Sequence, residues 1–232
     1  SSSKHLKPWN ILKAGMKYIF DKSGPLAETY AVAGGFLKTD KTLEVPDAQV
    51  VLLSALGPAK TGGAGYKIRD LLPDEHGFGL TVYQGSPRSR GSVTLRSPDP
   101  FDQPLITSGY FSDPHDMEVL KTAVKKMRKM MKQPAISQFI EKELAPGGDI
   151  EDDISLEKEI RRNGATAYHQ CASCAMGPED DSVLNEKLQV RGIDKLRIAD
   201  ASVMPRIPNA ALHAPSMMIG EKAAALIKGE II

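Results

Sequence analysis

The sequence predicts an α+β fold in which an antiparallel sheet is covered by helices. Two observations favour this class. Some segments place apolar residues at every second position, as half-buried strands do, and others space them three and four residues apart, as helices do. The composition is that of a globular protein: 232 residues, 41% hydrophobic and 25% charged, are enough for one large domain or two small ones.

A helix is predicted over residues 9–22, and it ends at the Ser-Gly-Pro sequence at 23–25. Apolar residues with helical spacing run along it: Trp9, Leu12, Met16, Ile19 and Phe20. The chain opens on this amphipathic segment without a preceding strand, so we expect it to be part of a longer protein. A buried strand is predicted over 48–56, an apolar run bounded by Pro46 and Gly57.

A surface loop is predicted over 59–77, a region rich in Gly, Lys and Asp that includes His76. After it, apolar residues alternate with others at Phe78, Leu80 and Val82, and again at Val93 and Leu95. We expect these two segments to pair as an antiparallel hairpin that is joined through residues 85–91.

The clearest helix signal follows Asp113, which is suited to cap the first turn, and Pro114, which is suited to the first helical position. The expected core-facing residues repeat at three and four: Met117, Leu120, Val124, Met127 and Met131. The opposite face carries Lys121, Lys125, Lys126, Arg128, Lys129 and Lys132. A solvated surface explains these cations better than an anion-binding patch does.

Residues 145–157 are acidic and predict a solvated connector, followed by a polar helix over 158–162 that ends before Gly164. A short strand is predicted over 195–200, then a loop with Pro205 and Pro208. A last helix opens near 214–216 and is expected to bury Ile219, Ala223, Leu226 and Ile227. The free N–H groups and the dipole of that helix favour an electron-rich ligand group at its N-terminus.

Composition excludes several classes of protein. Lys and Arg total 30 against 29 Asp and Glu, so no basic excess indicates a nucleic-acid partner. No apolar run is long enough for a transmembrane segment, and the start has no signal-peptide core. We therefore expect a cytoplasmic or peripheral membrane protein, although this segment does not determine location. Two cysteines are too few for a disulfide framework.

Two of the five histidines lie in suggestive positions, although a lone histidine is more often structural. His169 follows Tyr168, and His213 directly precedes the last helix, whose dipole disfavours its cationic form. His169, Cys171 and Cys174 could together bind zinc, but no fourth ligand with matching spacing follows. A redox pair of cysteines is a further alternative, but the strand and helix that usually flank one are not predicted here.

Several blocks in order resemble the glucose–methanol–choline (GMC) oxidoreductase family, whose members include glucose oxidase and choline dehydrogenase. The blocks are SPRSRGSVTL at 86–95 with SPDP at 97–100, Tyr-His at 168–169 with Cys-Ala-Met-Gly at 174–177, and 196–205 followed by HAPSMMIGEKA at 213–223. The resemblance covers about residue 24 to the end and corresponds to the C-terminal portion of the family.

This resemblance implies FAD-dependent oxidation of a small-molecule alcohol at a CH–OH group, with His169 as the catalytic histidine and His213 at the second catalytic position. It implies that the backbone at Asp200 and Ala201 lies by the FAD phosphates or ribityl chain. The residues implied to face the isoalloxazine are Ala214, Pro215, Ser216 and Met217. The electron acceptor stays open between oxygen, a quinone and a carrier protein.

The resemblance also implies a division of the chain. Residues 1–166 are expected to form part of a substrate-binding domain. Residues 167–232 are expected to supply the last strand and helix of a Rossmann-like FAD-binding domain. The family's Gly-rich motif for the ADP moiety is absent from the chain, so an N-terminal FAD-binding half is implied as a partner. Three alternatives remain open: an inactive substrate-binding module, a zinc-binding module, and a lyase that uses the same pocket.

The sequence departs from the family pattern in two places. Gln-Cys-Ala-Ser at 170–173 stands where Pro-Val-Gly-Thr is frequent, and Ala-Ala-Leu at 210–212 precedes His213 in place of small polar residues. Both departures leave the two histidines intact. They put the substrate preference in question.

Overall fold

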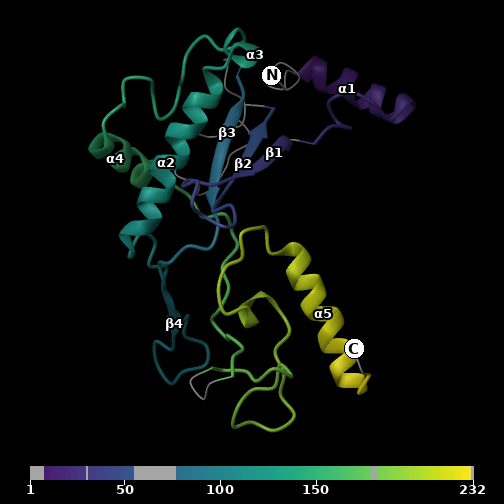
Figure 1. The fold of residues 1–232 in the computed structure, drawn as a ribbon. Coiled ribbons are helices and arrows are strands. Elements are labelled where there is room, and N and C mark those ends of the chain that lie inside the picture. The colour runs from purple at the N-terminus through teal and green to yellow at the C-terminus, as the bar shows by residue number, and fades with distance from the viewer. Residues whose placement is uncertain (1–7, 30, 55–76, 179–181, 231–232) are drawn as a thin grey trace. The chain divides into compact units, whose positions relative to one another are not determined.

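The computed structural model describes residues 8–29, 31–54, 77–178 and 182–230, and the chain divides into two compact units (Figure 1). The first unit is Ser1–Tyr83 with Met117–Thr166, and the second is Gln84–Asp116 with Ala167–Ile232. Each unit is therefore built from two separate stretches of sequence. The predicted loop that contains His76 lies, apart from its last residue, outside the described residues.

Helix α1 spans Pro8–Asp21 and confirms the first predicted helix. Its apolar stripe does not lie in a core: Trp9 is 65% exposed and Phe20 is 74% exposed, whereas Ala14 on the opposite side is buried. None of the helices in the described ranges is long and apolar enough to cross a membrane. An apolar stripe of this size is typical of a surface that contacts another protein segment or a ligand.

The first unit contains a three-stranded sheet in the order β1-β2-β3, formed by Ala31–Leu37, Ala48–Leu53 and Gly79–Gln84. Strands β1 and β2 are antiparallel, with Leu37 opposite Ala48 and Ala31 opposite Leu53. The described strand β2 begins where the sequence predicted it, and β1 was not predicted. Ala48 and Val50 of β2 are buried and contribute to the core of this unit.

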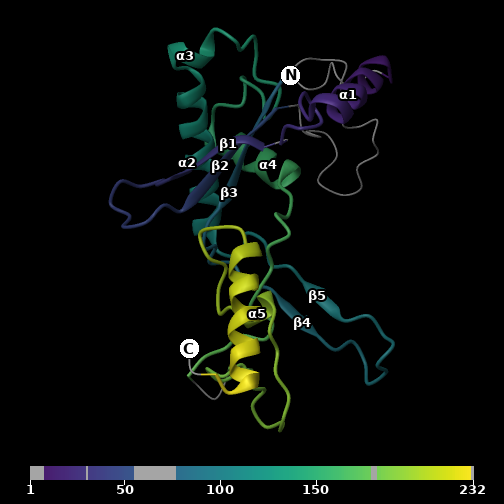
Figure 2. The same ribbon diagram turned by 90° about the vertical axis from the view of Figure 1, so that its right-hand side faces the viewer.

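The predicted hairpin is wrong. Both strands exist, but β3 lies beside β2, whereas β4 (Ser92–Thr94) pairs antiparallel with β5 (Leu105–Thr107) in a separate two-stranded sheet (Figure 2). Residues 85–91 do not form a hairpin turn, because the backbone N–H groups of Arg88 and Ser89 donate to the carboxylate of Asp116. This distant acceptor directs the chain away from β3.

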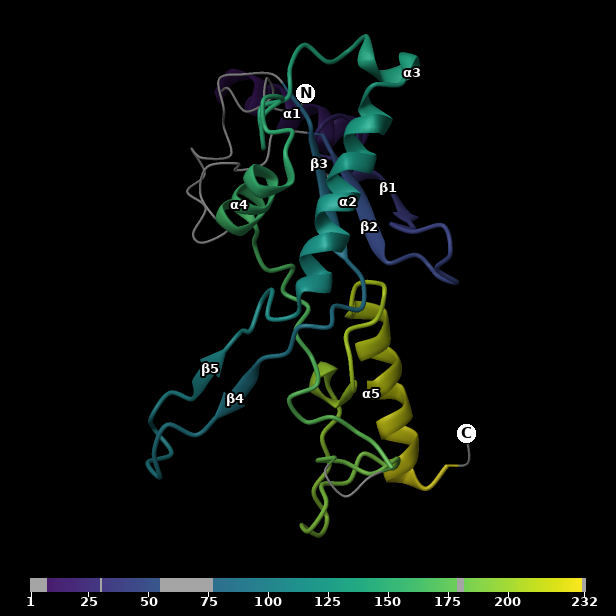
Figure 3. The ribbon, with the colours of Figure 1, turned by 60° about the vertical axis from the view of Figure 1, so that its left-hand side comes forward.

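Helix α2 spans Pro114–Met131 and begins as predicted, since Asp113 Oδ1 accepts from the N–H of His115 at 2.9 Å. It runs alongside the sheet of the first unit (Figures 1 and 3). Met117 and Met127 are buried, as the periodicity predicted, together with Val119 and Ala123. The α+β class is confirmed, with small antiparallel sheets in place of one larger sheet.

The cationic face of α2 is only partly a solvated surface. Lys121 is 7% exposed and pairs with Glu118 at 2.6 Å. Arg128 makes a bidentate pair with Glu143 and also donates to the carbonyls of Gly147 and Ile150. Several of the predicted surface cations thus hold neighbouring segments of the first unit together.

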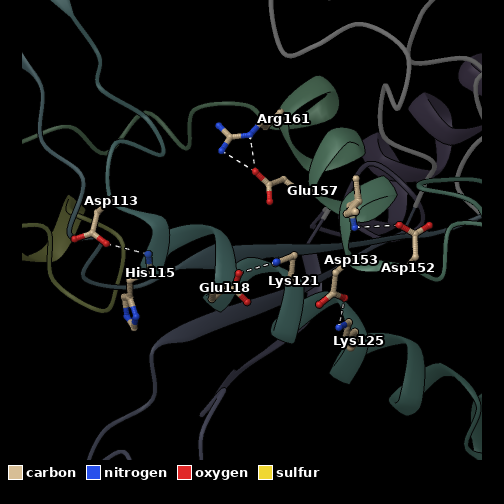
Figure 4. A network of polar contacts seen from close by, with 10 residues as sticks. Asp113, His115, Glu118, Lys121, Lys125, Asp152, Asp153, Glu157 and Arg161 are labelled. Atoms are coloured by element: carbon tan, nitrogen blue, oxygen red, sulfur yellow. Dashed lines mark hydrogen bonds and ion pairs between the residues drawn. The ribbon is translucent and has the colours of Figure 1, made fainter.

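Helices α3 (Pro134–Ser137) and α4 (Asp153–Asn163) follow. Helix α4 begins inside the predicted acidic connector, because Asp152 caps it by accepting from the N–H groups of Ile154 and Ser155. It ends before Gly164, as predicted. Leu156 is fully buried, and Lys125 of α2 pairs with Asp153 at the start of α4 (Figure 4).

The second unit is organised around one apolar cluster, which receives residues from three stretches of its C-terminal part. Its buried members are Leu184, Leu188, Val203, Met204, Leu212, Ile219 and Ala223. The 3-10 helix η3 (Ala201–Val203) and helix α5 (His213–Lys228) supply several of them. The last predicted helix is confirmed, although Ala225 is buried and Ile227 is 67% exposed.

The predicted strand over 195–200 is wrong. Lys195 has φ +61°, which is incompatible with an extended strand, and the segment forms an isolated bridge between Gln189 and Arg197. The N–H groups of Val190 and Ile198 donate across this bridge region at 3.0 and 3.2 Å. Residues 195–198 therefore belong to a loop that is closed by hydrogen bonds to residues 188–190.

Candidate functional site

His169 lies in an irregular segment of the second unit. The residue before it, Tyr168, has φ +60°, and Ala172 has φ +72°. These are left-handed conformations that cost a non-glycine residue about 1–2 kcal/mol each. Such conformations concentrate at functional sites, where surrounding structure maintains them. The His169 side chain is half-buried.

The ring of His169 contacts the residue that precedes α5. The N–H of Leu212 donates to His169 Nδ1 at 3.4 Å, a long hydrogen bond. A backbone N–H can only donate, so Nδ1 accepts and the neutral ring carries its proton on Nε2. The two predicted catalytic histidines are thus linked through Leu212, the immediate neighbour of His213.

His213 is the first residue of α5, and its side chain is exposed. Leu212 anchors the helix start: its side chain is buried, and its carbonyl accepts from Ser216 N at 2.9 Å and Ser216 Oγ at 2.7 Å. The amides of His213 and Ala214 belong to the first helical turn and have no carbonyl acceptor within the helix. They form an exposed edge of donors at the positive end of the helix dipole.

The segments that carry the predicted site residues lie next to one another. The N–H of Cys174 donates to Ser202 O at 3.1 Å, and the N–H of Met176 donates to Val203 O at 2.9 Å. Ala201 and Cys171 pack against the cluster that contains Leu212. The structure therefore brings together 169–176, 200–203 and 212–217, which are far apart in the sequence.

Asp200 is exposed, and its carboxylate is engaged locally. It caps η3 by accepting from Ser202 N at 2.8 Å and from Ser202 Oγ at 2.5 Å. These hydrogen bonds from Ser202, the hydroxyl contributing most, hold the pKa of Asp200 below its ordinary value. The side chain therefore stabilises the turn, and the adjoining backbone is the part of this segment that could meet a ligand.

The residues predicted to face a flavin have mixed exposure. Ala214 and Met217 are exposed, with Met217 at 62%, whereas Pro215 and Ser216 are half-buried. Ser216 bonds back to Leu212 and is not directed outward. The exposed amide edge and the apolar Met217 surface fit a planar ring with a hydrogen-bond-accepting carbonyl edge, so the residues present are compatible with FAD.

The cysteine alternatives receive no support. Cys171 and Cys174 are both free and half-buried. Burial raises the pKa of the Cys171 thiol, against the opposing influence of the Arg90 charge, so the thiol is protonated and weakly reactive at neutral pH. Within the described ranges, no group of three or more His, Cys, Asp or Glu side chains is placed to hold a metal ion.

Sequence reasoning missed the anchor of the segment before β4. Asp116 is 2% exposed and accepts from Gln84 Nε2 at 2.7 Å and from the backbone N–H groups of Arg88 and Ser89 at 2.9 Å. Burial disfavours its ionisation, but the hydrogen bonds from Ser89, Arg88 and Gln84 outweigh burial and lower the pKa of the carboxyl. In sequence, Asp116 reads only as a favourable charge in the first helical turn.

Two of the cavities among the described residues have no histidine in their lining. One of about 460 Å³ is lined by Asn185 and residues 189–195 of the second unit. The other, of about 350 Å³, is lined by Glu151 and by Lys125, Arg128, Lys129 and Lys132 of α2 in the first unit.

Comparison with known proteins gives a consistent pattern. The C-terminal family model described as GMC oxidoreductase matches residues 87–220. The oxygen-dependent choline dehydrogenase of Burkholderia cenocepacia (strain HI2424) is 36% identical over 97% of this chain and 38% of its own length. The chain thus spans about two fifths of the length of such curated relatives.

Solved structures share the fold. A formate oxidase aligns with a TM-score of 0.82 at 24% identity, over 98% of this chain and 43% of that one. A fungal aryl-alcohol oxidase aligns with a TM-score of 0.63 at 30% identity, over 79% of this chain and 28% of that one.

Proposed function

Because the chain belongs to the GMC oxidoreductase family, we propose that it is the C-terminal portion of an FAD-dependent enzyme that oxidises an alcohol to the carbonyl, with His169 and His213 handling the proton. The observation that carries this proposal is the Leu212–His169 contact, which links the two histidine segments at the start of α5. The names of the relatives, a choline dehydrogenase and an aryl-alcohol oxidase, support an alcohol substrate.

Particular parts of the second unit would hold FAD. The amide edge of α5 would face the flavin ring through Ala214 and Met217, and the backbone at Asp200 and Ala201 would lie by the phosphates or ribityl chain. When bound, FAD supplies the two-electron acceptor for hydride from the alcohol carbon. The N–H donors and helix dipole of α5 would stabilise negative charge at the ring edge that they face.

Both histidines would act on the hydroxyl proton of the alcohol. In the observed arrangement His169 Nε2 carries a proton and can hold the alcohol oxygen by donating to it. To accept the hydroxyl proton at Nε2, His169 would first have to exchange its ring proton to Nδ1 through solvent, and the Leu212 N–H would then no longer donate to Nδ1. His213, at the N-terminus of α5, hydrogen-bonds the same oxygen and shares the proton.

We further assign 1–166 to the substrate side and 167–232 to the flavin side, completing a Rossmann-like domain supplied by an N-terminal half. The first unit of the structure ends at Thr166, which supports that boundary, although Gln84–Asp116 is grouped with the C-terminal residues. A chain lacking the N-terminal half is then expected to be an inactive substrate-binding module. Flavin titration of the isolated chain tests this point, and stoichiometric binding of FAD contradicts it.

The activity is tested with protein expressed from the complete reading frame that carries this chain. Anaerobic addition of a panel of alcohols should bleach the flavin absorbance of the wild-type protein. His169→Ala should slow that reduction by about 10²- to 10⁴-fold, the usual contribution of a general acid or base. His115→Ala, a histidine of α2 outside the site, is the matched control and should reduce flavin at the wild-type rate.

Undiminished reduction in His169→Ala would overturn the assignment of the catalytic histidine. Absence of flavin reduction by every alcohol in the wild-type protein would overturn the proposed reaction. Product formation without flavin reduction would favour the lyase alternative.

A further inference from the structure

The segment before β4 is held between two charged side chains. On one side the Asp116 carboxylate accepts from its backbone N–H groups. On the other, Nη1 of Arg90 donates to the carbonyls of Pro87, Arg88 and Ser89 at 2.8, 3.1 and 3.0 Å. Asp116 thus satisfies backbone donors of this stretch, and Arg90, which belongs to the stretch, satisfies backbone acceptors; these bonds restrain residues 84–90, which we call the support.

This support contacts the loop that leads into α5. Ser86 Oγ donates to Asn209 Oδ1 at 2.7 Å. Beside it, a Cβ added to Gly85 would lie 2.6 Å from Asn209 Oδ1 and 3.1 Å from Asn209 Cα. The backbone of Gly85 therefore packs directly on Asn209, and glycine is required there to permit the approach.

Asn209 lies only a few residues before the histidine contact. Between it and α5 the chain has no regular secondary structure, so its course depends on what fixes its two ends. One end is the buried side chain of Leu212, which belongs to the apolar cluster. The other end is Asn209 on its support. Both ends must be held for the Leu212 N–H to remain directed at His169 Nδ1.

Building on the proposed function, we infer that Asp116 is a positioning residue for the two histidines: through residues 84–90 and Asn209 it fixes the loop that enters α5. Asp116 touches no reacting group. Its effect passes through the support, Asn209 and Leu212 to the ring of His169, and through the same loop to His213. All of these residues belong to the second unit.

The test uses protein from the complete reading frame, labelled with ¹⁵N-histidine, so that ring-nitrogen resonances report the contact directly. Asp116→Asn weakens the anchor, and Ser86→Ala removes only the hydroxyl bond to Asn209. Both should shift the ring-nitrogen resonances of His169. Both should also lower kcat for the alcohol by about 10-fold or more with a smaller change in KM, as misplacement of a reacting group does.

Asp40→Asn is the matched control, because Asp40 also accepts from a backbone N–H and a hydroxyl, both of Thr42 at 2.8 Å, but lies in the first unit. It should leave the His169 resonances unchanged. If Asp116→Asn does not fold, Ser86→Ala decides the question. Unchanged His169 resonances in the folded variants overturn the inference. The resonances do not depend on turnover, so a failure of the proposed reaction is distinguished from a failure of the positioning role.

Discussion

Two residues beside His169 have backbone angles that side chains seldom adopt. Tyr168 and Ala172 are both left-handed, with φ of +60° and +72°. Neither position was predicted from the sequence, because a tyrosine and an alanine carry no local signal for that conformation. The tertiary contacts of the second unit impose it, including the bond from Cys174 N to Ser202 O.

Replacement of Ala172 by glycine measures the cost of this conformation. Ala172→Gly should raise the free energy of unfolding by about 1 kcal/mol, because relief of left-handed strain exceeds the added entropy of the unfolded chain. Urea unfolding of the wild-type and variant proteins gives the difference. Ala175→Gly, at a residue without a positive φ, is the control and should lower stability. A loss of stability in both variants would show that the backbone at Ala172 is not strained.

At the scale of elements, the base of the β4–β5 hairpin depends on two glycines in backbone contact. A Cβ at Gly91 would lie 2.2 Å from Thr107 O, and one at Gly109, which has φ +64°, would lie 2.0 Å from Arg90 O. These close backbone contacts connect the support around Arg90 to the segment after β5. They leave no space for even a methyl group.

Gly91→Ala should therefore destabilise the protein by about 3 kcal/mol, the upper range for overpacking against atoms that cannot yield. The melting temperature and the free energy of unfolding are the measurements. Gly148→Ala is the matched control, because no atom lies within 4 Å of a Cβ placed there. A Gly91→Ala protein as stable as the control would contradict this packing.

The elements that the sequence predicted correctly are those with local signals. Helix α2 has a capping aspartate, a proline at its first position and apolar residues at helical spacing. Strand β1 was missed because its AVAGGFL sequence has two glycines and few β-branched residues, and β5 because it is only three residues long. The strand pairing of β3 and β4 was mispredicted because it is decided by Asp116, which is distant in sequence.

In the candidate site, too, contacts between residues distant in sequence could not be predicted. His169 and His213 were proposed from a resemblance between ordered blocks of sequence, and the structure places their segments side by side. Asn209 carried no signal, because its contact partners, Gly85 and Ser86, lie far away along the chain. Contacts of this kind depend on the completed fold and cannot be read from spacing or composition.

At the scale of the whole molecule, several carboxylates stabilise the folded state through their ionised form. The pKa values of these carboxyls are held below their ordinary range: Asp40, Asp116, Asp152, Asp153 and Asp200. The main causes are hydrogen bonds, from Thr42 to Asp40 and from Lys125 to Asp153 for example; for Asp116, burial opposes ionisation but is outweighed.

These lowered pKa values predict that the folded state loses stability in acid. A carboxyl with a lowered folded pKa contributes stability that is fully present above its unfolded pKa of about 3.9 and is lost as pH falls through the folded value. The contribution of these carboxyls to the free energy of unfolding should therefore be constant near neutrality and decrease below about pH 4. Asp116→Asn should show a shallower acid decrease than the wild type. An equal decrease in both proteins would contradict the contribution of Asp116.

The second unit consists of two stretches of sequence, which the ribosome synthesises at different times. After residues 1–83, the first stretch of this unit, 84–116, emerges; residues 117–166 then complete the other unit, and only afterwards do residues 167–232 appear. The support around Asp116 therefore emerges before Asn209, and the hydrogen bond from Ser86 to Asn209 forms only later. Of the two units, the one that carries His169 and His213 is therefore the later to be completed during synthesis.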